Sequence, residues 1–219
     1  MYNWPYGGAT RAVTGSIMGQ TLGYLALFLG IFSVASILGV GLGRAGLWIG
    51  LIAIFGGTLM VNRAVARATA ALPWGIVVSA GMGILVGPVI WLTAVSDPHL
   101  VLSALLSLVL AVALAGAAVA WIPWDFSRLA PLLMVGLLLL VFTGLLSWLI
   151  PGLTGFAMSP VYNLIGVGIF TGYLLVDFSL LKYRGMMFAG NGAAVLMATA
   201  ILVDIVNLFL FLLMLGRRR

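Results

Sequence analysis

The chain has 219 residues, of which 64% are hydrophobic and only 6% are charged, a composition that excludes a water-soluble domain. The formal charge of +6 comes from Lys and Arg residues scattered between apolar runs, which indicates contact with anionic lipid headgroups rather than with nucleic acid. Cysteine is absent, so disulfides and Cys-ligated metal sites are excluded.

Apolar segments recur along the whole chain, and seven of them are long enough to cross a bilayer as helices, which takes about 20 residues. We therefore predict an all-α integral membrane protein, a seven-transmembrane-helix bundle that forms a single domain over residues 1–219. The predicted spans, in chain order, are residues 16–40, 45–66, 73–95, 100–121, 131–150, 160–181 and 193–215.

Small residues repeat at every fourth position in three of the first four predicted spans. The repeats are Gly15, Gly19 and Gly23; Gly75, Ser79, Gly83 and Gly87; and Ser103, Ser107, Ala111 and Ala115. Such a face lets helix backbones approach closely in lipid. We therefore predict tight packing through small residues in the first, third and fourth spans, but not in the second.

The polar residues between the spans have structural explanations. Asp97 precedes a proline and is expected in a turn, and Asp125 and Ser127 are placed to cap the fifth span. His99, the only histidine, is expected to be solvated next to that turn. With a single histidine there is no His-rich zinc set and no Ser-His arrangement, so we expect that the protein is not an enzyme.

Basic residues between the spans predict a cytoplasmic N-terminus, because cytoplasmic loops are enriched in Lys and Arg. In that orientation the inner loops hold Arg11, Arg63, Arg67, Arg128, Lys182 and Arg184, and the outer side holds Arg44 and the terminal Arg217, Arg218 and Arg219. The terminal triplet opposes this orientation, so a six-span version with a re-entrant last segment stays open. The spans leave no long polar tails, which favours a prokaryotic plasma membrane.

Two aspartates are the only acids inside any apolar segment. Asp204 lies near the middle of the last span, with Asn207 a turn further on the same face, and Asp177 lies near the end of the sixth span. A carboxylate at such a depth costs at least ~2.5 kcal/mol, so both should face protein or water. A flexible loop joins the two spans, so we expect antiparallel neighbours with both acids in the inner half, close enough to meet.

Two carboxylates in contact cannot both ionise cheaply, so such a pair shares a proton near neutral pH. The pair can serve as a proton switch, a site for a hard cation, or a catalytic dyad. Intramembrane aspartyl proteases place their second acid in a G-x-G-D motif. Here Asp204 follows Ile201, Leu202 and Val203, which disfavours a protease.

Two segments resemble the last two helices of a bacterial-type member of the Bax inhibitor-1 family, also called the transmembrane Bax inhibitor motif family. GIFTGYLLVDFSLL, residues 168–181, has the Gly-Tyr-x-Leu-x-Asp pattern, and ILVDIVNLFLFLLMLG, residues 201–216, has Asp followed by two apolar residues and Asn-Leu-Phe. The rest of the chain agrees in span count, length and a basic end to the second span. Relatives commonly carry an aromatic residue before each acid, where this chain has Val176 and Val203.

The resemblance implies a bundle with the last helix at its centre and a pH-sensitive calcium leak. Asp177 and Asp204 would be the pH sensor near the cytosolic side and would contact calcium, with Asn207 as a supporting polar residue. Relatives also have an arginine at the end of the second helix that engages the acid. Arg63 is our preferred candidate for this role, with Arg67 as the alternative. The partners implied are the lipid bilayer, calcium as the transported ion, and protons, with no cofactor.

Two other classes of function stay open. The first is a non-conducting interaction protein, since some bacterial relatives are linked to the regulation of a membrane protease; it predicts no ion flux and a co-purifying membrane partner. The second is a proton-coupled transporter that uses the same acids. A transporter of that kind favours inverted repeats with broken helices, and no convincing repeat relates the first three spans to the next three.

Overall fold

The computed structural model describes residues 7–67, 69–150, 155–156, 159–184 and 192–217, with the backbone alone at residues 7–16, 148 and 184. Seven α-helices in this part of the chain are long and apolar enough to span a membrane, which confirms the predicted all-α, seven-span fold. They are α1 (Gly7–Gly41), α2 (Gly43–Ala66), α3 (Leu72–Ser96), α4 (Pro98–Trp121), α5 (Ala130–Leu149), α7 (Pro160–Arg184) and α8 (Ala193–Gly216). A short 3₁₀ helix, η1 (Phe126–Leu129), precedes α5.

The helices divide into two compact units. The first comprises Met1–Leu92 with Leu180–Leu202, and the second Thr93–Ser179 with Val203–Arg219, so α3, α7 and α8 contribute to both. The last helix, α8, is continuous, which agrees with a full seventh span rather than a re-entrant segment. It is also the most buried of the seven, with 61% of its membrane segment covered. Its position at the centre of a single-domain bundle stays a prediction.

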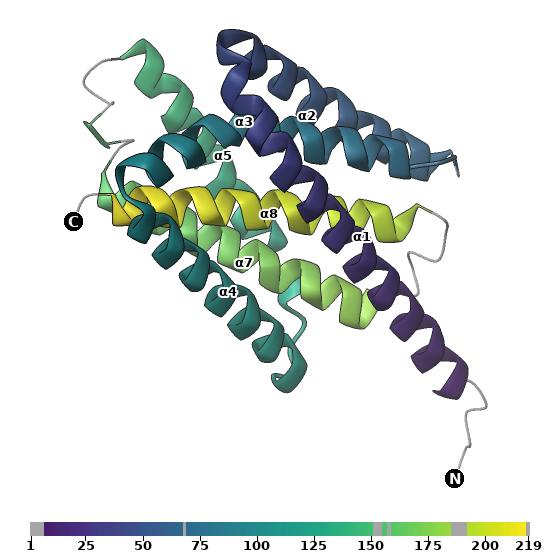
Figure 1. Ribbon diagram of the computed structural model, residues 1–219. Coiled ribbons are helices and arrows are strands. Elements are labelled where there is room, and N and C mark those ends of the chain that lie inside the picture. Colours follow the sequence, from purple (N-terminus) through teal and green to yellow (C-terminus); the bar gives the residue numbers. More distant parts are fainter. Residues whose placement is uncertain (1–6, 68, 151–154, 157–158, 185–191, 218–219) are drawn as a thin grey trace. The chain divides into compact units, whose positions relative to one another are not determined.

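Glycines set the packing of the first unit, where α2 runs alongside α3 (Figure 1). A methyl group added at Gly83 of α3 would strike the backbone of Phe32 in α1. A methyl group added at Gly50 of α2 would approach the carbonyl oxygen of Gly81 in α3 at 2.9 Å. The backbones are therefore too close for any larger side chain, and the small-residue prediction for the third span is confirmed.

The small-residue predictions for the other spans were wrong. A Cβ added at Gly19 or Gly23 of α1 would meet nothing within 4 Å among the described residues, and Gly15 lies outside the described side chains. In α4, Ser103 and Ser107 are exposed. The buried positions of α4 are Leu100, Ala104, Leu108, Ala115 and Val119, so of the four predicted positions only Ala115 is buried. Conversely, α2 presents three buried glycines, Gly46, Gly50 and Gly57, toward its neighbours. A four-residue repeat defines a helix face, but whether that face meets protein or lipid depends on the other helices.

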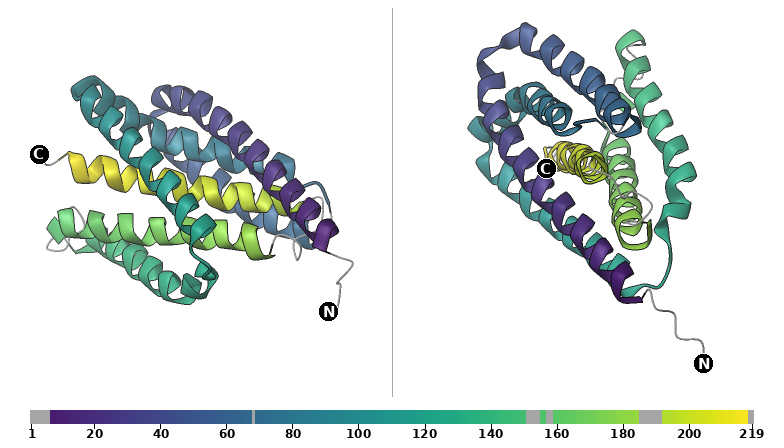
Figure 2. Two further views of the ribbon diagram at one scale, coloured as in Figure 1. Left: turned by 90° about the horizontal axis from the view of Figure 1, so that it is seen from below. Right: turned by 90° about the vertical axis from the view of Figure 1, so that its right-hand side faces the viewer.

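In the second unit, α5 lies antiparallel to α7, as both views in Figure 2 show. A Cβ on Gly172 of α7 would approach Leu133 of α5 at 2.7 Å. Towards the other end of this helix pair, the hydroxyl of Tyr162 in α7 donates a 2.8 Å hydrogen bond to the carbonyl oxygen of Leu140. Because an unpaired polar group is costly in lipid, this bond anchors the tyrosine to the neighbouring helix.

Two aspartates begin helices in this unit. Asp97 is the N-cap of α4, since its carboxylate accepts a 3.1 Å hydrogen bond from the N–H of Leu100, with Pro98 in the first turn. Asp125 caps η1 by accepting from the N–H of Ser127 at 3.0 Å. Capping by Asp125 was predicted for α5, but the chain first makes a turn of 3₁₀ helix, and α5 begins without a side-chain cap.

Candidate functional site: a buried acid pair

Asp177 of α7 and Asp204 of α8 lie together inside the second unit, where these parts of the two helices run side by side (Figures 1 and 2). The side chains are 7% and 8% exposed, and the two carboxyl groups are within hydrogen-bonding reach of each other. A carboxylate can only accept hydrogen bonds, so a direct bond between two carboxyl groups requires that one carries a proton. The structure therefore has the geometry of a shared-proton pair.

Several residues near the pair along both helices are apolar and buried. Val176 precedes Asp177 and is 4% exposed, while Leu174, Leu202 and Leu208 are fully buried. Low-dielectric surroundings penalise the ionised form of a carboxyl group and strengthen the repulsion between two such groups. These surroundings therefore disfavour two negative charges at the site.

Tyr173 is a member of the site that the sequence analysis missed. It lies one helical turn before Asp177, so both project from the same face of α7. Its ring interacts electrostatically with both carboxyl groups, and its hydroxyl is buried without a hydrogen-bond partner among the described residues. The Oδ2 atom of Asp177 is likewise buried and unpaired. The i, i+4 spacing to Asp177 was the available sequence signal for Tyr173.

Asn207, expected as a supporting polar residue, lies on α8 one turn beyond Asp204 and is partly buried. Its Nδ2 donates a 2.9 Å hydrogen bond to the carbonyl oxygen of Val203 in the same helix. Such a bond to the i−4 carbonyl satisfies the amide locally.

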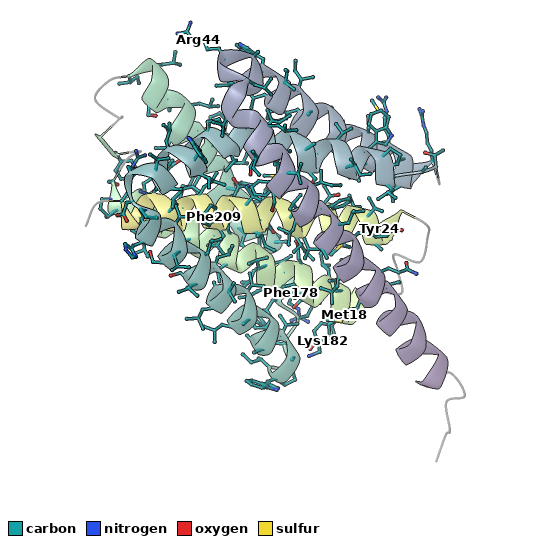
Figure 3. All side chains as sticks on the ribbon, viewed as in Figure 1. Met18, Tyr24, Arg44, Phe178, Lys182 and Phe209 are labelled. Atoms are coloured by element: carbon teal, nitrogen blue, oxygen red, sulfur yellow. The ribbon has the colours of Figure 1, made fainter. Side chains whose placement is uncertain are left out.

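Ser179 connects the site to the segment before α5. Its Oγ accepts a 3.2 Å hydrogen bond from the backbone N–H of Phe126, and Ser179 is fully buried. Phe178, labelled on α7 in Figure 3, contacts α4, since a Cβ on Gly116 would lie 3.9 Å from its ring. The polypeptide around Asp177 is therefore held by α4 and η1 as well as by α8.

The basic candidates lie elsewhere in the chain. Arg63 and Arg67 are exposed at the end of α2 in the first unit, whereas the acid pair belongs to the second. Arg44 lies in the first turn of α2, where Figure 3 shows it projecting from the ribbon. Lys182 lies near the end of α7, with its Nζ 4.9 Å from the ring centre of Tyr183. The side chains of Arg11 and Arg184, and residues Arg218 and Arg219, lie outside the described part. His99 is exposed, as expected.

The acid pair offers few ligands for a resident calcium ion. Within the described ranges, no group of three or more His, Cys, Asp or Glu residues could hold a metal. Calcium takes six to eight oxygen ligands. Asp177 and Asp204, even with the Tyr173 hydroxyl, supply too few, so a calcium ion at this site would keep most of its water shell.

Seven apolar helices with a carboxyl pair buried between the last two define a polytopic helical membrane protein with an ionisable site inside its membrane region. The sequence matches the family described as "Inhibitor of apoptosis-promoting Bax1" over residues 14–218, nearly the whole chain, and the protein belongs to this Bax inhibitor-1 family. A search of the curated proteins found no match. The resemblance seen in the two acid-bearing segments is therefore confirmed and extends over the other spans.

Proposed function

We propose that this protein is a pH-sensitive calcium leak channel of a prokaryotic plasma membrane, with its N-terminus in the cytoplasm. The observation that carries the proposal is the contact between the buried carboxyl groups of Asp177 and Asp204, one on each of two adjacent antiparallel helices. A carboxyl pair inside a membrane protein is costly and marks an ion or proton pathway by default.

The shared proton keeps the pathway closed. While one carboxyl group is protonated, it donates to the other and holds α7 against α8. After the proton leaves, two negative charges about 4 Å apart repel by about 4 kcal/mol at an effective dielectric constant of 20. That energy loosens the contact between the helices, and the two carboxylates then attract a hydrated calcium ion through their oxygen atoms. Calcium leak therefore rises with pH.

Arg63 is the proposed ionic partner of the open state. An arginine stays charged at every relevant pH, so it can pair with an aspartate only after that aspartate ionises. The Asp-Asp contact is then exchanged for an Asp-Arg contact. Arg67 is the alternative partner, one helical turn further along the chain.

Calcium-dye fluorescence in proteoliposomes tests the proposal at several pH values, from roughly 6 to 8, around the physiological range. Wild-type protein should leak more calcium as pH rises. The Asp177→Asn and Asp204→Asn variants cannot ionise at the substituted position and should show a flat pH response. Asp97→Asn is the matched control, because asparagine also caps a helix and Asp97 is exposed.

Two results would count against the channel. If wild-type flux equals that of protein-free liposomes at every pH, the protein does not conduct calcium. The alternative function, a non-conducting interaction protein, is then favoured. A full pH response in both Asp→Asn variants would place the sensor elsewhere in a conducting protein, with His99 as the next candidate.

A further inference from the structure

Five residues of α7 form a stripe on one side of the helix: Asn163, Gly166, Phe170, Tyr173 and Asp177. Their spacing of three or four residues keeps them on one face, and we call them the α7 stripe. Gly166 and Phe170 contact Phe211 of α8, and Asp177 contacts Asp204. The stripe therefore faces α8 in the second unit.

Both ends of the stripe carry buried oxygen atoms without partners. Asn163 is only 2% exposed, and its Oδ1 has no hydrogen-bond partner within the described residues. At the other end, the hydroxyl of Tyr173 and Oδ2 of Asp177 are also buried and have no hydrogen-bond partner within the described residues. Buried polar groups are almost always paired with protein, water or an ion. Oxygen atoms in this arrangement suit a hydrated cation.

Aromatic rings separate the two ends. The ring of Phe211 lies directly against Gly166 and stacks on Phe170, with ring centres 5.7 Å apart and planes inclined by 26°. It also contacts Tyr162, at 5.9 Å between ring centres. Tyr162 is itself held by its hydrogen bond to Leu140. In an ion path along this face, such a cluster of rings would form an apolar barrier that excludes water and blocks ions.

We propose that the α7 stripe lines the ion path, that Asn163 provides a second cation-contacting oxygen at the end away from the acids, and that Phe211 is a hydrophobic gate between Asn163 and the acid pair. The inference rests on the proposed calcium leak, and it adds a second barrier whose side chains do not change charge with pH. Gly166 is required by the gate, because any side chain at that position would push the Phe211 ring out of its place.

Two glycines on the same helix give a matched test. A methyl group added at Gly166 meets the ring of Phe211, whereas one added at Gly168 meets nothing within 4 Å among the described residues. Gly166→Ala should raise the calcium leak by roughly tenfold, the factor that corresponds to losing one aromatic contact, and should keep the pH response. Gly168→Ala should leak like the wild type. Phe211→Leu, which keeps an apolar side chain but removes the ring, should act like Gly166→Ala.

The absence of cysteine allows a test that does not depend on flux. A single Asn163→Cys substitution should react with a charged, membrane-impermeant thiol reagent, whereas Leu164→Cys, on the exposed side of α7, should face lipid and stay unreactive. Tyr173→Cys should react faster from the Asn163 side when Gly166→Ala is also present.

The two hypotheses fail separately. If the wild-type protein shows no calcium flux but the cysteine variants are labelled as predicted, the calcium leak is rejected. The proposal that the α7 stripe lines a water-accessible path is then kept. Equal leak from the Gly166→Ala and Gly168→Ala variants in a conducting protein would overturn the gate. If Asn163→Cys stays unreactive both with and without Gly166→Ala, the proposal that the α7 stripe lines the ion path is wrong.

Discussion

The backbone N–H of Phe126 donates a 3.2 Å hydrogen bond to Oγ of Ser179, across 53 positions of sequence. Both residues are buried, and Ser179 lies two positions beyond Asp177 on α7. The N–H of the first residue of a 3₁₀ helix has no partner within its own helix, and here a side chain from another helix satisfies it. The bond therefore ties η1 to the end of the acid-bearing helix.

Removing that acceptor should destabilise the second unit. Ser179→Ala leaves the buried N–H of Phe126 unpaired, which costs about 1–3 kcal/mol. Thermal unfolding of the detergent-solubilised protein should show a lower midpoint for Ser179→Ala. Ser33→Ala is the control, because Ser33 is exposed and its hydroxyl donates to the Leu29 carbonyl of its own helix. Equal midpoints for the two variants would mean that the Phe126 bond contributes little.

Two other glycine substitutions should have opposite effects on stability. A Cβ at Gly87 of α3 would collide with the backbone of Ser36, so Gly87→Ala must separate α1 from α3 and should lower the unfolding midpoint. A Cβ at Gly30 of α1 would meet nothing within 4 Å in the described part, so Gly30→Ala should stabilise its helix by about 0.5–1 kcal/mol. The measurement is again thermal unfolding in detergent. Two shifts of the same sign would contradict the close α1–α3 packing.

The arginine at the end of α2 should set the pH at which the channel opens. If Arg63 pairs with the ionised aspartate, it favours loss of the shared proton. Arg63→Ala should then move the midpoint of the calcium leak to higher pH, and Arg67→Ala should leave it unchanged. The measurement is the proteoliposome leak across the pH series. A shift with Arg67→Ala alone would identify Arg67 as the partner.

The orientation of the chain can be measured with single cysteines at exposed arginines. A cytoplasmic N-terminus and seven spans place Arg44 and Arg217 on the outer side and Arg128 on the inner side. Arg44→Cys and Arg217→Cys should therefore react with an impermeant thiol reagent added outside intact cells, and Arg128→Cys only after lysis. Arg217 is a better probe than Gly216, where any side chain would collide with Leu100. If Arg217→Cys is labelled only after lysis, the C-terminal end is on the inner side, and the chain crosses the membrane one time fewer than predicted.

The sequence alone determined the membrane class, the seven helices and the family. Runs of about 20 apolar residues specify spanning helices because lipid offers no partner for the backbone, and this holds whatever lies beside each helix. Asp177 and Asp204 could be identified for the same reason, since an acid in an apolar span stands out by its cost. Their meeting on antiparallel helices was predicted from the flexible loop that joins the two spans.

Only the tertiary structure decided which helix faces are in contact. The four-residue repeat of small residues correctly predicted that Gly83 packs closely on α1, but Gly19 and Ser103 do not pack closely on another helix in the described part of the chain. Periodicity defines a face of a helix, but it does not tell which helix, if any, lies against that face. The unpaired hydroxyl of Tyr173 and the Phe126–Ser179 bond depend on atoms brought close by packing. Burial and hydrogen bonding are properties of pairs of helices, and a single helix sequence does not contain them.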